Sequence, residues 1–277
     1  MGKYVLAISG GVDSVVMLDI LSKIPGNELI VAHFDHGIRQ DSGIDAIFVA
    51  GLAKKYDLPF ETKREKLGPD ASEDKARLHR YKFLRSIAKK HNAKLVTAHH
   101  GDDIVESIAI NLLRGTGWRG LAVMDSDVER LMTSLTKLEI LEYAKRNKLV
   151  WREDSTNAED KYLRNQIRRK TMRLEEDVRR QLLALWSDQK RIKKQIKDEV
   201  KRLVGNGPSY NRHFFIHIDE ASAIECLRYI TDNRLTHPQL EKLLHAVKTI
   251  AHGKNIELGG GVKVKFTTRN FTVELIK

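Results

Sequence analysis

Short apolar runs alternate with longer amphipathic stretches along the first 150 residues of the chain. The apolar runs have the length and composition of buried strands and lie at 4–8, 29–34 and 94–99, with a further extended stretch at 59–64. Apolar residues recur at helical spacing in the intervening stretches, at 14–21, 42–56, 73–91 and 102–114. This alternation predicts an α/β fold with a parallel, doubly wound sheet, which binds ligands beyond the carboxyl ends of its strands.

The pattern changes after this region. A short helix is predicted at 138–147, because Thr136 and Glu139 have the spacing of a capping box. Residues 161–204 then favour helix almost throughout, with one apolar stripe and basic residues elsewhere. We expect the stripe to pack against a neighbouring element while the Lys and Arg side chains face solvent.

A glycine-rich stretch at 205–208 is typical of a domain boundary. Beyond it the sequence predicts a strand at 214–218, two helices, and a hairpin around Gly259–Gly261. The second of these helices is expected to begin after Thr236. The chain is therefore divided into residues 1–150, a basic helical segment at 151–204, and a small α+β domain at 205–277.

The positive charge is concentrated in one part of the chain. Of the net charge of +12, residues 161–202 contribute 15 basic against 6 acidic side chains, whereas residues 1–160 contain 24 of each. Such clustering beside a neutral region favours a nucleic-acid partner, because phosphates supply most of the attraction to a basic surface. A solvated helix face is the alternative interpretation.

The single cysteine, Cys226, excludes an internal disulfide framework and any Cys-x-x-Cys metal or redox pair. No run of about 18 apolar residues could span a bilayer, and no signal-peptide pattern precedes the first strand. We therefore expect a cytoplasmic protein without a membrane partner. The sequence leaves open whether it forms a homodimer.

Residues Ser9–Ser14 connect the first predicted strand to a helix expected to start at Ser14. Two adjacent glycines allow backbone N–H groups to converge on an anion, and the helix N-terminus adds its positive dipole end. The lysine that reaches the β and γ phosphates in the usual mononucleotide loop is missing here. The pattern favours a pyrophosphate-binding loop, with an ordinary tight turn as the alternative.

Two further groups of polar residues follow predicted strands. His33–Arg39 contains imidazoles and a carboxylate that either contact a nucleotide or bond one another. Asp102, Asp103 and Glu106 converge on one helix face, and their mutual repulsion calls for a cation, either Mg²⁺ or an ammonium group. Zinc binding by His99 and His100 is disfavoured, because no third ligand lies at suitable spacing.

Taken together, these motifs resemble one family, the tRNA(Ile)-lysidine synthetases, which belong to the PP-loop superfamily of N-type ATP pyrophosphatases. The resemblance covers residues 4–170 and rests, in order, on Ser9–Ser14, His33–Arg39, Ala76-Arg77 with Arg80-Tyr81, Ala98–Asp103 with Glu106-Ser107, Arg114–Gly117 with Gly120-Leu121, Trp151–Asn157, and Arg164–Arg168. It implies an adenine nucleotide α-hydrolase-like fold for residues 1–150 and a short family form with one C-terminal domain.

The resemblance implies a ligase that uses ATP and Mg²⁺. ATP adenylates the C2 oxygen of the wobble cytidine in a tRNA(Ile) with a CAU anticodon and releases pyrophosphate. Free L-lysine then displaces AMP through its ε-amine. Nucleophilic attack requires a neutral amine, so a nearby carboxylate can serve as the base.

The same resemblance suggests roles for individual residues. The loop that holds pyrophosphate comprises Ser9, Gly10, Gly11, Val12, Asp13 and Ser14, with Asp13 as the candidate Mg²⁺ ligand. Contacts to the nucleotide are expected from His33, Arg77 and His99. The catalytic acids, which receive the lysine ammonium group or the metal, are Asp13, Asp102, Asp103 and Glu106. Contacts to lysine or tRNA are expected from Arg114, Arg164, Arg168, Arg169 and Lys170.

The chain also departs from the family pattern. An Arg-Pro-Leu-Leu stretch usually precedes the short helix, and here residues 130–135 replace it without the proline, after a short linker at 122–129. Other functions stay open from the sequence. A tRNA thiolase needs more cysteine than Cys226 supplies, an amidating NAD or GMP synthetase leaves the basic segment unexplained, and a non-catalytic RNA-binding module leaves the acids unexplained.

Overall fold

The computed structural model describes residues 2–37, 42–66, 68, 73–152, 163–205 and 207–276. It divides into two compact units, Met1–Gln189 and Lys190–Lys277. The division falls inside the long helix α7, Glu176–Val204. The three-part division expected from the sequence stays a prediction.

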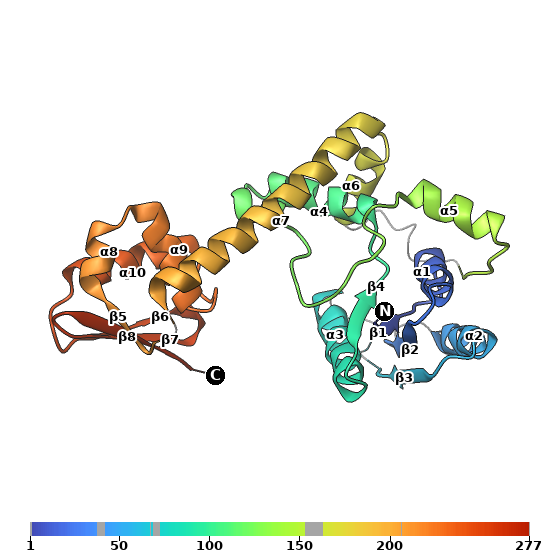
Figure 1. Cartoon of the computed structure of the whole chain (residues 1–277), viewed down its shortest axis with the longest axis horizontal. Coiled ribbons are helices and arrows are strands. Elements are labelled where there is room, and N and C mark those ends of the chain that lie inside the picture. Colours follow the sequence, from blue (N-terminus) through green and yellow to red (C-terminus); the bar gives the residue numbers. More distant parts are fainter. Residues whose placement is uncertain are drawn as a thin grey trace. The chain divides into compact units, whose positions relative to one another are not determined.

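The first unit contains a parallel four-stranded sheet (Figure 1). Its strands are β1 (Lys3–Ala7), β2 (Glu28–Asp35), β3 (Phe60–Arg64) and β4 (Lys94–Thr97), in the order β3-β2-β1-β4. Ala7 at the end of β1 pairs with both Ala32 and Thr97. The carboxyl ends of these strands therefore meet at one edge of the sheet, as the sequence predicted.

Helices cover both faces of this sheet. They are α1 (Val12–Ser22), α2 (Ser42–Lys55), α3 (Glu73–Lys90) and α5 (Lys137–Arg146). Helix α4 (Gly101–Leu113) follows β4 and contributes Ile104 and Ile108 to a separate cluster. Leu6, Val31 and Val96 share a core cluster with residues of α1, α2 and α5, whereas Val5 and Ile30 join α3 in a second cluster. Neighbouring strand residues point to opposite faces, so the doubly wound sheet is confirmed.

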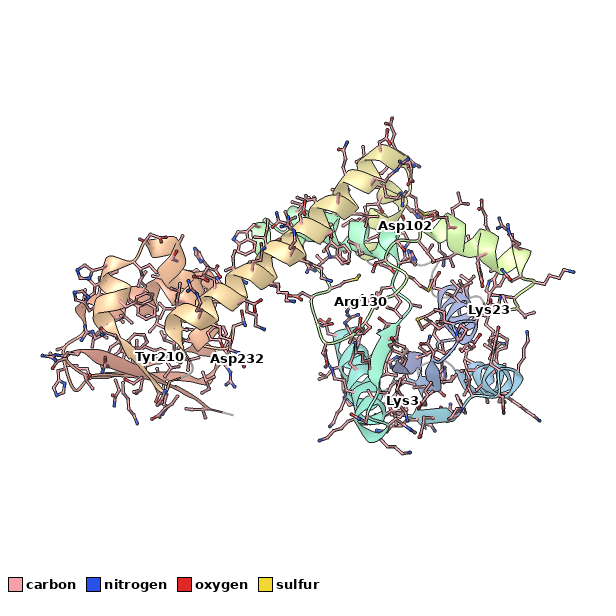
Figure 2. The ribbon with its side chains drawn as sticks, viewed as in Figure 1. Lys3, Lys23, Asp102, Arg130, Tyr210 and Asp232 are labelled. Carbon is pink, nitrogen blue, oxygen red and sulfur yellow. The ribbon has the colours of Figure 1, made fainter. Side chains whose placement is uncertain are left out.

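The stretch that lacks the family's proline runs beside β4. Glu129 and Met132 form parallel bridges to Val96 and His100. The guanidinium of Arg130 (Figure 2) holds the preceding loop by donating to the carbonyl oxygens of Met124 and Val128, at 2.6 and 3.0 Å. Partly buried backbone carbonyls thus receive hydrogen bonds from a charged side chain.

The second unit packs helices against an antiparallel sheet. The sheet has the order β5-β8-β7-β6, with β5 at Ser209–Asn211, β6 at Asn255–Leu258, β7 at Val262–Phe266 and β8 at Asn270–Leu275. The helices beside it are α9 (Glu220–Ile230) and α10 (His237–Thr249). Leu258 pairs with Val262 across the glycines, and Thr236 with Gln239 forms the capping box of α10. Both expectations are confirmed.

The strand expected at 214–218 is wrong, because this stretch forms the short helix α8, Arg212–His217. The Asn211 side chain accepts a hydrogen bond from the backbone N–H of His213 and so caps the helix. Phe215 is buried whereas Ile216 is exposed, a pattern too short to separate strand from helical spacing.

None of the helices in the described part of the chain combines the length and the apolar character that a membrane span requires.

Candidate functional site

The glycine loop after β1 is tightly wound around the hydroxyl of Ser14. This oxygen accepts hydrogen bonds from the N–H groups of Ser9 and Gly10, at 3.3 and 3.2 Å, and donates to the carbonyl of Gly11 at 2.9 Å. Gly10 has a φ of 96°, a backbone conformation that is strained for any residue with a side chain. Helix α1 begins at Val12 rather than at Ser14, and this places Asp13 in its first turn.

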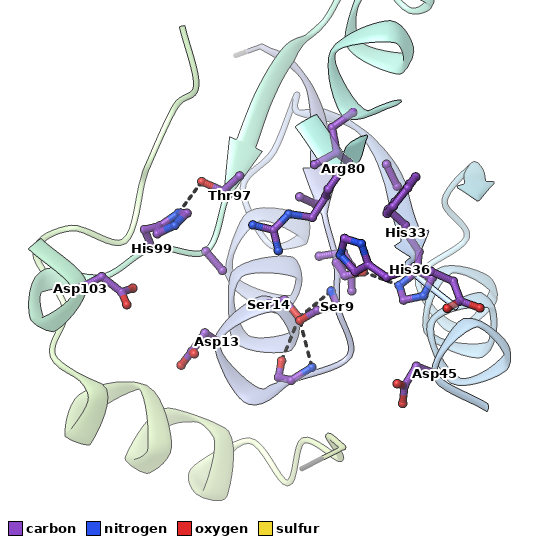
Figure 3. A pocket seen from close by; sticks show the side chains of 18 of the residues that line it. Ser9, Asp13, Ser14, His33, His36, Asp45, Arg80, Thr97, His99 and Asp103 are labelled. Atoms are coloured by element: carbon purple, nitrogen blue, oxygen red, sulfur yellow. Dashed lines mark hydrogen bonds between the residues drawn. The ribbon is translucent and has the colours of Figure 1, made fainter. Parts of the chain in front are cut away.

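A cavity of about 490 Å³ opens at the carboxyl edge of the sheet (Figure 3). The three predicted loops all contribute to it, and its polar lining consists of Ser9, Asp13, Ser14, His33, Asp35, His36, Asp45, Arg80, Thr97, His99 and Asp103. The structure thus brings together Ser9, Gly11, Asp13, Ser14, His33 and His99 of the predicted nucleotide contacts. Ile38 and Arg39 lie outside the described residues.

Two imidazoles contribute polar atoms to the cavity wall. His33 donates from Nδ1 to the carbonyl of Ile8 at 2.8 Å. Within the described residues, its buried Nε2 and the buried Nδ1 of His36 have no hydrogen-bond partner. Burial and the nearby charge of Arg80 lower the pKa of His36. A neutral His36 imidazole can accept a hydrogen bond from a ligand.

Arg80 lines the cavity, whereas Arg77 does not. The Arg77 guanidinium lies over the ring of Tyr81, 4.9 Å from its centroid. The role of Arg77 at the nucleotide stays a prediction. Arg80 follows three residues later on the same helix, so a helical pattern alone could not decide which arginine faces the nucleotide.

Basic side chains of the same chain form ion pairs with two of the predicted acids. Lys137, the first residue of α5, places Nζ 2.5 Å from Oδ1 of Asp13 and donates its backbone N–H to Oδ2 of Asp102 at 2.7 Å. Arg179 of α7 forms an ion pair with Asp102. The sequence predicted that these acids need a cation, and the structure shows that internal side chains supply part of the positive charge.

Glu106 is held by an arginine from the basic segment. Arg168 of α6, Leu163–Thr171, donates from Nε and one terminal nitrogen to the two carboxylate oxygens, at 2.7 and 3.3 Å. The Glu106 side chain is 3% exposed. The bidentate contact to Glu106 raises the pKa of Arg168, and Asp103 and Asp13 add to this effect. Of the four acids, only Asp13 and Asp103 line the cavity.

His100 lies among the acids. Its Nε2 is 3.6 Å from Oδ2 of Asp103 and 3.9 Å from Oδ1 of Asp13. Its backbone N–H donates to Asp103, which begins α4 with a capping interaction. Among the described residues, no group of three or more His, Cys, Asp or Glu side chains could hold a metal ion.

Arg114, Arg169 and Lys170 do not line the cavity. Arg114 follows α4 and is separated from Glu106 by eight residues, or about 12 Å along the helix axis. Arg169 and Lys170 are exposed on α6, and the side chain of Arg164 lies outside the described part of the chain. Sequence reasoning missed Lys137, Arg80 and Arg179 as members of the site. Their roles in binding stay predictions.

Comparison with known proteins finds relatives whose similarity extends over up to 98% of this chain. Residues 1–175 match the PP-loop domain family. The tRNA(Ile)-lysidine synthase of Thermosipho africanus is 32% identical over 95% of this chain and 68% of its own length, and that of Thermotoga maritima is 30% identical over 98% and 69%. A third, from Caldanaerobacter subterraneus subsp. tengcongensis, is 39% identical over 64% of this chain and 41% of its own length.

Among solved structures, the U34-tRNA thiolase from Methanococcus maripaludis with its 4Fe-4S cluster superposes with a TM-score of 0.57 at 18% identity, over 69% of this chain and 72% of the thiolase. This likeness shows a shared fold. It agrees with the parallel sheet and the cavity at its carboxyl edge.

Proposed function

Because this chain belongs to the tRNA(Ile)-lysidine synthase family and carries a PP-loop domain, we propose that it joins L-lysine to the wobble cytidine of a tRNA(Ile) with a CAU anticodon. The observation that carries the proposal is the meeting of the glycine loop, the imidazoles and Asp103 in one cavity. A nucleotide and an amine can both reach such a site. The reaction is a ligation driven by ATP.

In the first step the loop binds the pyrophosphate of ATP. The N–H groups that now contact Ser14 would turn to the phosphate oxygens, aided by the positive end of α1. His33 and His36 offer unpartnered ring nitrogens to the base or ribose. Adenylation forms a bond from the C2 oxygen of cytidine to the α-phosphorus and breaks the bond to pyrophosphate.

Mg²⁺ fits this end of the cavity as a metal that arrives with the nucleotide. Asp13 offers one carboxylate beside the loop, and Mg²⁺ commonly uses one or two carboxylates together with substrate phosphates and water. Bound there, it would neutralise negative charge on the leaving pyrophosphate.

Lys137 supplies the positive charge that the loop itself lacks. Its ammonium group lies on Asp13, at the entrance to α1, although the two residues are 124 positions apart. A phosphate near Asp13 would therefore meet a lysine, as it does in ordinary mononucleotide loops. We assign to Lys137 the stabilisation of the developing pyrophosphate.

Replacement of Lys137 by methionine should lower the rate of pyrophosphate release about 100-fold, because a preorganised cation is lost from the transition state. Lys137→Arg should restore part of that rate. Lys145→Met on the same helix is the matched control and should leave the rate unchanged. Single-turnover release of labelled pyrophosphate measures all three, and a Lys137→Met rate equal to that of wild type would exclude this role.

In the second step the lysine ε-amine attacks C2 of the cytidine and AMP leaves. We propose that Asp103 meets the amine, because Asp103 lines the cavity and Glu106 does not. A carboxylate there can accept the ammonium proton and leave a neutral nucleophile. Arg114 stays the predicted partner of the lysine carboxylate.

The basic segment is proposed to bind tRNA. Charge-neutralising substitution of Lys190, Arg191, Lys193 and Lys194 together should weaken binding of matched and mismatched tRNAs alike. For every phosphate that the variant no longer binds, the slope of log K against log salt should fall by roughly 0.7 to 0.9. Filter binding across a salt series measures both quantities.

The charge-matched control for this variant neutralises Lys54, Lys55, Lys89 and Lys90. These residues end α2 and α3, at the edge of the sheet opposite the cavity. The control should keep wild-type affinity and salt slope. If the α7 variant did the same, the solvated-face interpretation of the segment would be correct.

The thiolase alternative is less well supported. Cys226, the single cysteine, is fully buried in the second unit, and burial raises the pKa of its thiol to about 11. A thiol of this kind is a poor nucleophile or cluster ligand near neutral pH.

Incubation with ATP, labelled lysine and tRNA(Ile) transcripts bearing CAU or UAU anticodons tests the proposal. We expect label only in the CAU species, with AMP and pyrophosphate as co-products. Release of ADP, or equal labelling of both transcripts, would overturn it.

A further inference from the structure

An exposed tryptophan, Trp118, follows helix α4 in a stretch that contains two arginines and no acidic residue. Residues Leu112–Trp118 are exposed without a break. Leu112, Leu113 and Trp118 are 54%, 72% and 37% exposed, respectively. Large apolar side chains that are exposed together commonly mark a binding surface. We call Leu112–Gly120 the Trp118 platform.

The backbone of the Trp118 platform is braced at both ends. The side-chain amide of Asn111 donates to the carbonyl of Gly120 at 2.7 Å, and the carbonyl of Asn111 accepts from the N–H of Thr116 at 3.2 Å. Gly120 in turn donates to Gly117 at 2.8 Å. Trp118 begins the short 3₁₀ helix η1, Trp118–Leu121. An indole held on a braced turn is preorganised for a planar ligand, since little entropy remains to be lost.

Trp118 is not part of the buried cluster that packs against α4. Leu121 and Met124 pack against the buried cluster of Ile104, Ile108 and Val123. Trp186 of α7 covers the same cluster and donates from its indole nitrogen to the carbonyl of Val123 at 2.9 Å. Among the described residues, Trp118 is not a member of this cluster, so packing of the first unit does not explain its position.

The platform carries positive charge beside its aromatic ring. The Arg119 guanidinium lies over the Trp118 ring, 4.8 Å from its centroid. Residues 112–120 contain Arg114 and Arg119 and no acidic residue. Aromatic faces and guanidinium planes are the surfaces on which unpaired RNA bases stack, and arginine also attracts the adjoining phosphates. This combination selects a single-stranded nucleic acid over an apolar protein segment.

We propose that the Trp118 platform stacks an unpaired base of the bound RNA other than the base that reacts. This inference rests on the proposed tRNA substrate. Asp103 and Leu113 are ten residues apart on α4, or about 15 Å along its axis. The stacked base is therefore a different one from the cytidine at the cavity, in the same unpaired loop.

Binding of an anticodon stem-loop RNA tests this proposal. Trp118→Ala should lower the affinity roughly five- to a hundredfold, the range observed for loss of one stacked base. Trp118→Phe should retain most of the affinity, because a ring remains. The salt slope should stay unchanged in both variants, since the basic side chains that bind phosphate are kept. A blunt RNA duplex should bind wild type and Trp118→Ala equally.

Ile47→Ala, at an exposed apolar residue of α2, is the matched control and should bind like wild type. Equal affinity of Trp118→Ala and wild type for the stem-loop would overturn the proposal, as would an equal loss for the duplex. Light scattering of the same variants detects self-association, and a loss of dimer with unchanged RNA affinity would assign the surface to a second copy of the chain. Lysine incorporation by wild type separately tests the proposed function.

Discussion

Replacement of Asp13 by alanine should block pyrophosphate release while tRNA still binds. Asp13 is the carboxylate in the first turn of α1, and it lines the cavity while holding the Lys137 ammonium group. Its removal takes away the proposed Mg²⁺ ligand and leaves Lys137 without its partner. We expect the single-turnover rate to fall at least about 100-fold, the loss typical of a group that stabilises charge in the transition state.

Two assays separate this effect from a loss of folding or of RNA binding. Filter retention follows tRNA affinity, which should stay within about twofold of wild type, since the basic charge of the chain is unchanged. Asp127→Ala, at an exposed carboxylate paired with Arg85, is the matched control for the rate assay. Near-normal pyrophosphate release by a folded Asp13→Ala variant would contradict the assignment.

The sequence predicted the parallel sheet and the edge at which its loops meet, because both follow from the hydrophobic pattern. Strands such as Leu29–Phe34 are apolar and short, and their positions decide where the loops must meet. Ser9, His33 and His99, which the sequence places at the ends of three predicted strands, all line the cavity. In a parallel sheet, the loops that follow the strands lie at the same edge even when they are distant in sequence. The order of strands and loops along the chain is therefore enough to predict which loops meet.

The partners of the acids could not be predicted in the same way. Lys137 and Arg168 reach Asp13 and Glu106 across 124 and 62 residues. The spacing of residues within one element does not predict such contacts. From the sequence, a basic residue of a charged helix that faces water cannot be distinguished from one that contacts a buried acid. The error at 214–218 has a different origin, since this apolar run is too short to separate strand from helix and the Asn211 side chain caps a helix there.

Arg168 also shows why a basic segment should not be treated as one uniform surface. Charge counting assigned it to tRNA together with its neighbours, yet its guanidinium is bonded to Glu106 inside the first unit. Arg169, the next residue, is exposed. The segment thus contains at least one residue that anchors α6 to α4. Substitution of an anchoring residue should lower the free energy of unfolding, whereas substitution of an RNA-binding residue should lower the affinity for RNA.

Arg168→Ala should lower the free energy of unfolding of the first unit by about 3 kcal/mol, because it removes the guanidinium that donates two hydrogen bonds to the 3% exposed Glu106 carboxylate. Arg169→Ala is the matched control and should change it by no more than about 0.5 kcal/mol. Urea unfolding followed by tryptophan emission reports on this unit, since Trp118, Trp151 and Trp186 all belong to it.

The double variant Glu106→Gln with Arg168→Met distinguishes a buried ion pair from simple loss of packing. If the cost of Arg168→Ala comes from loss of the ionic contact to the buried Glu106 carboxylate, removal of both charges should recover about half of the lost stability or more. If the arginine acts through its aliphatic stem, Arg168→Met alone should be close to wild type. Equal stabilities for Arg168→Ala and Arg169→Ala would mean that the contact to Glu106 does not hold α6 in place.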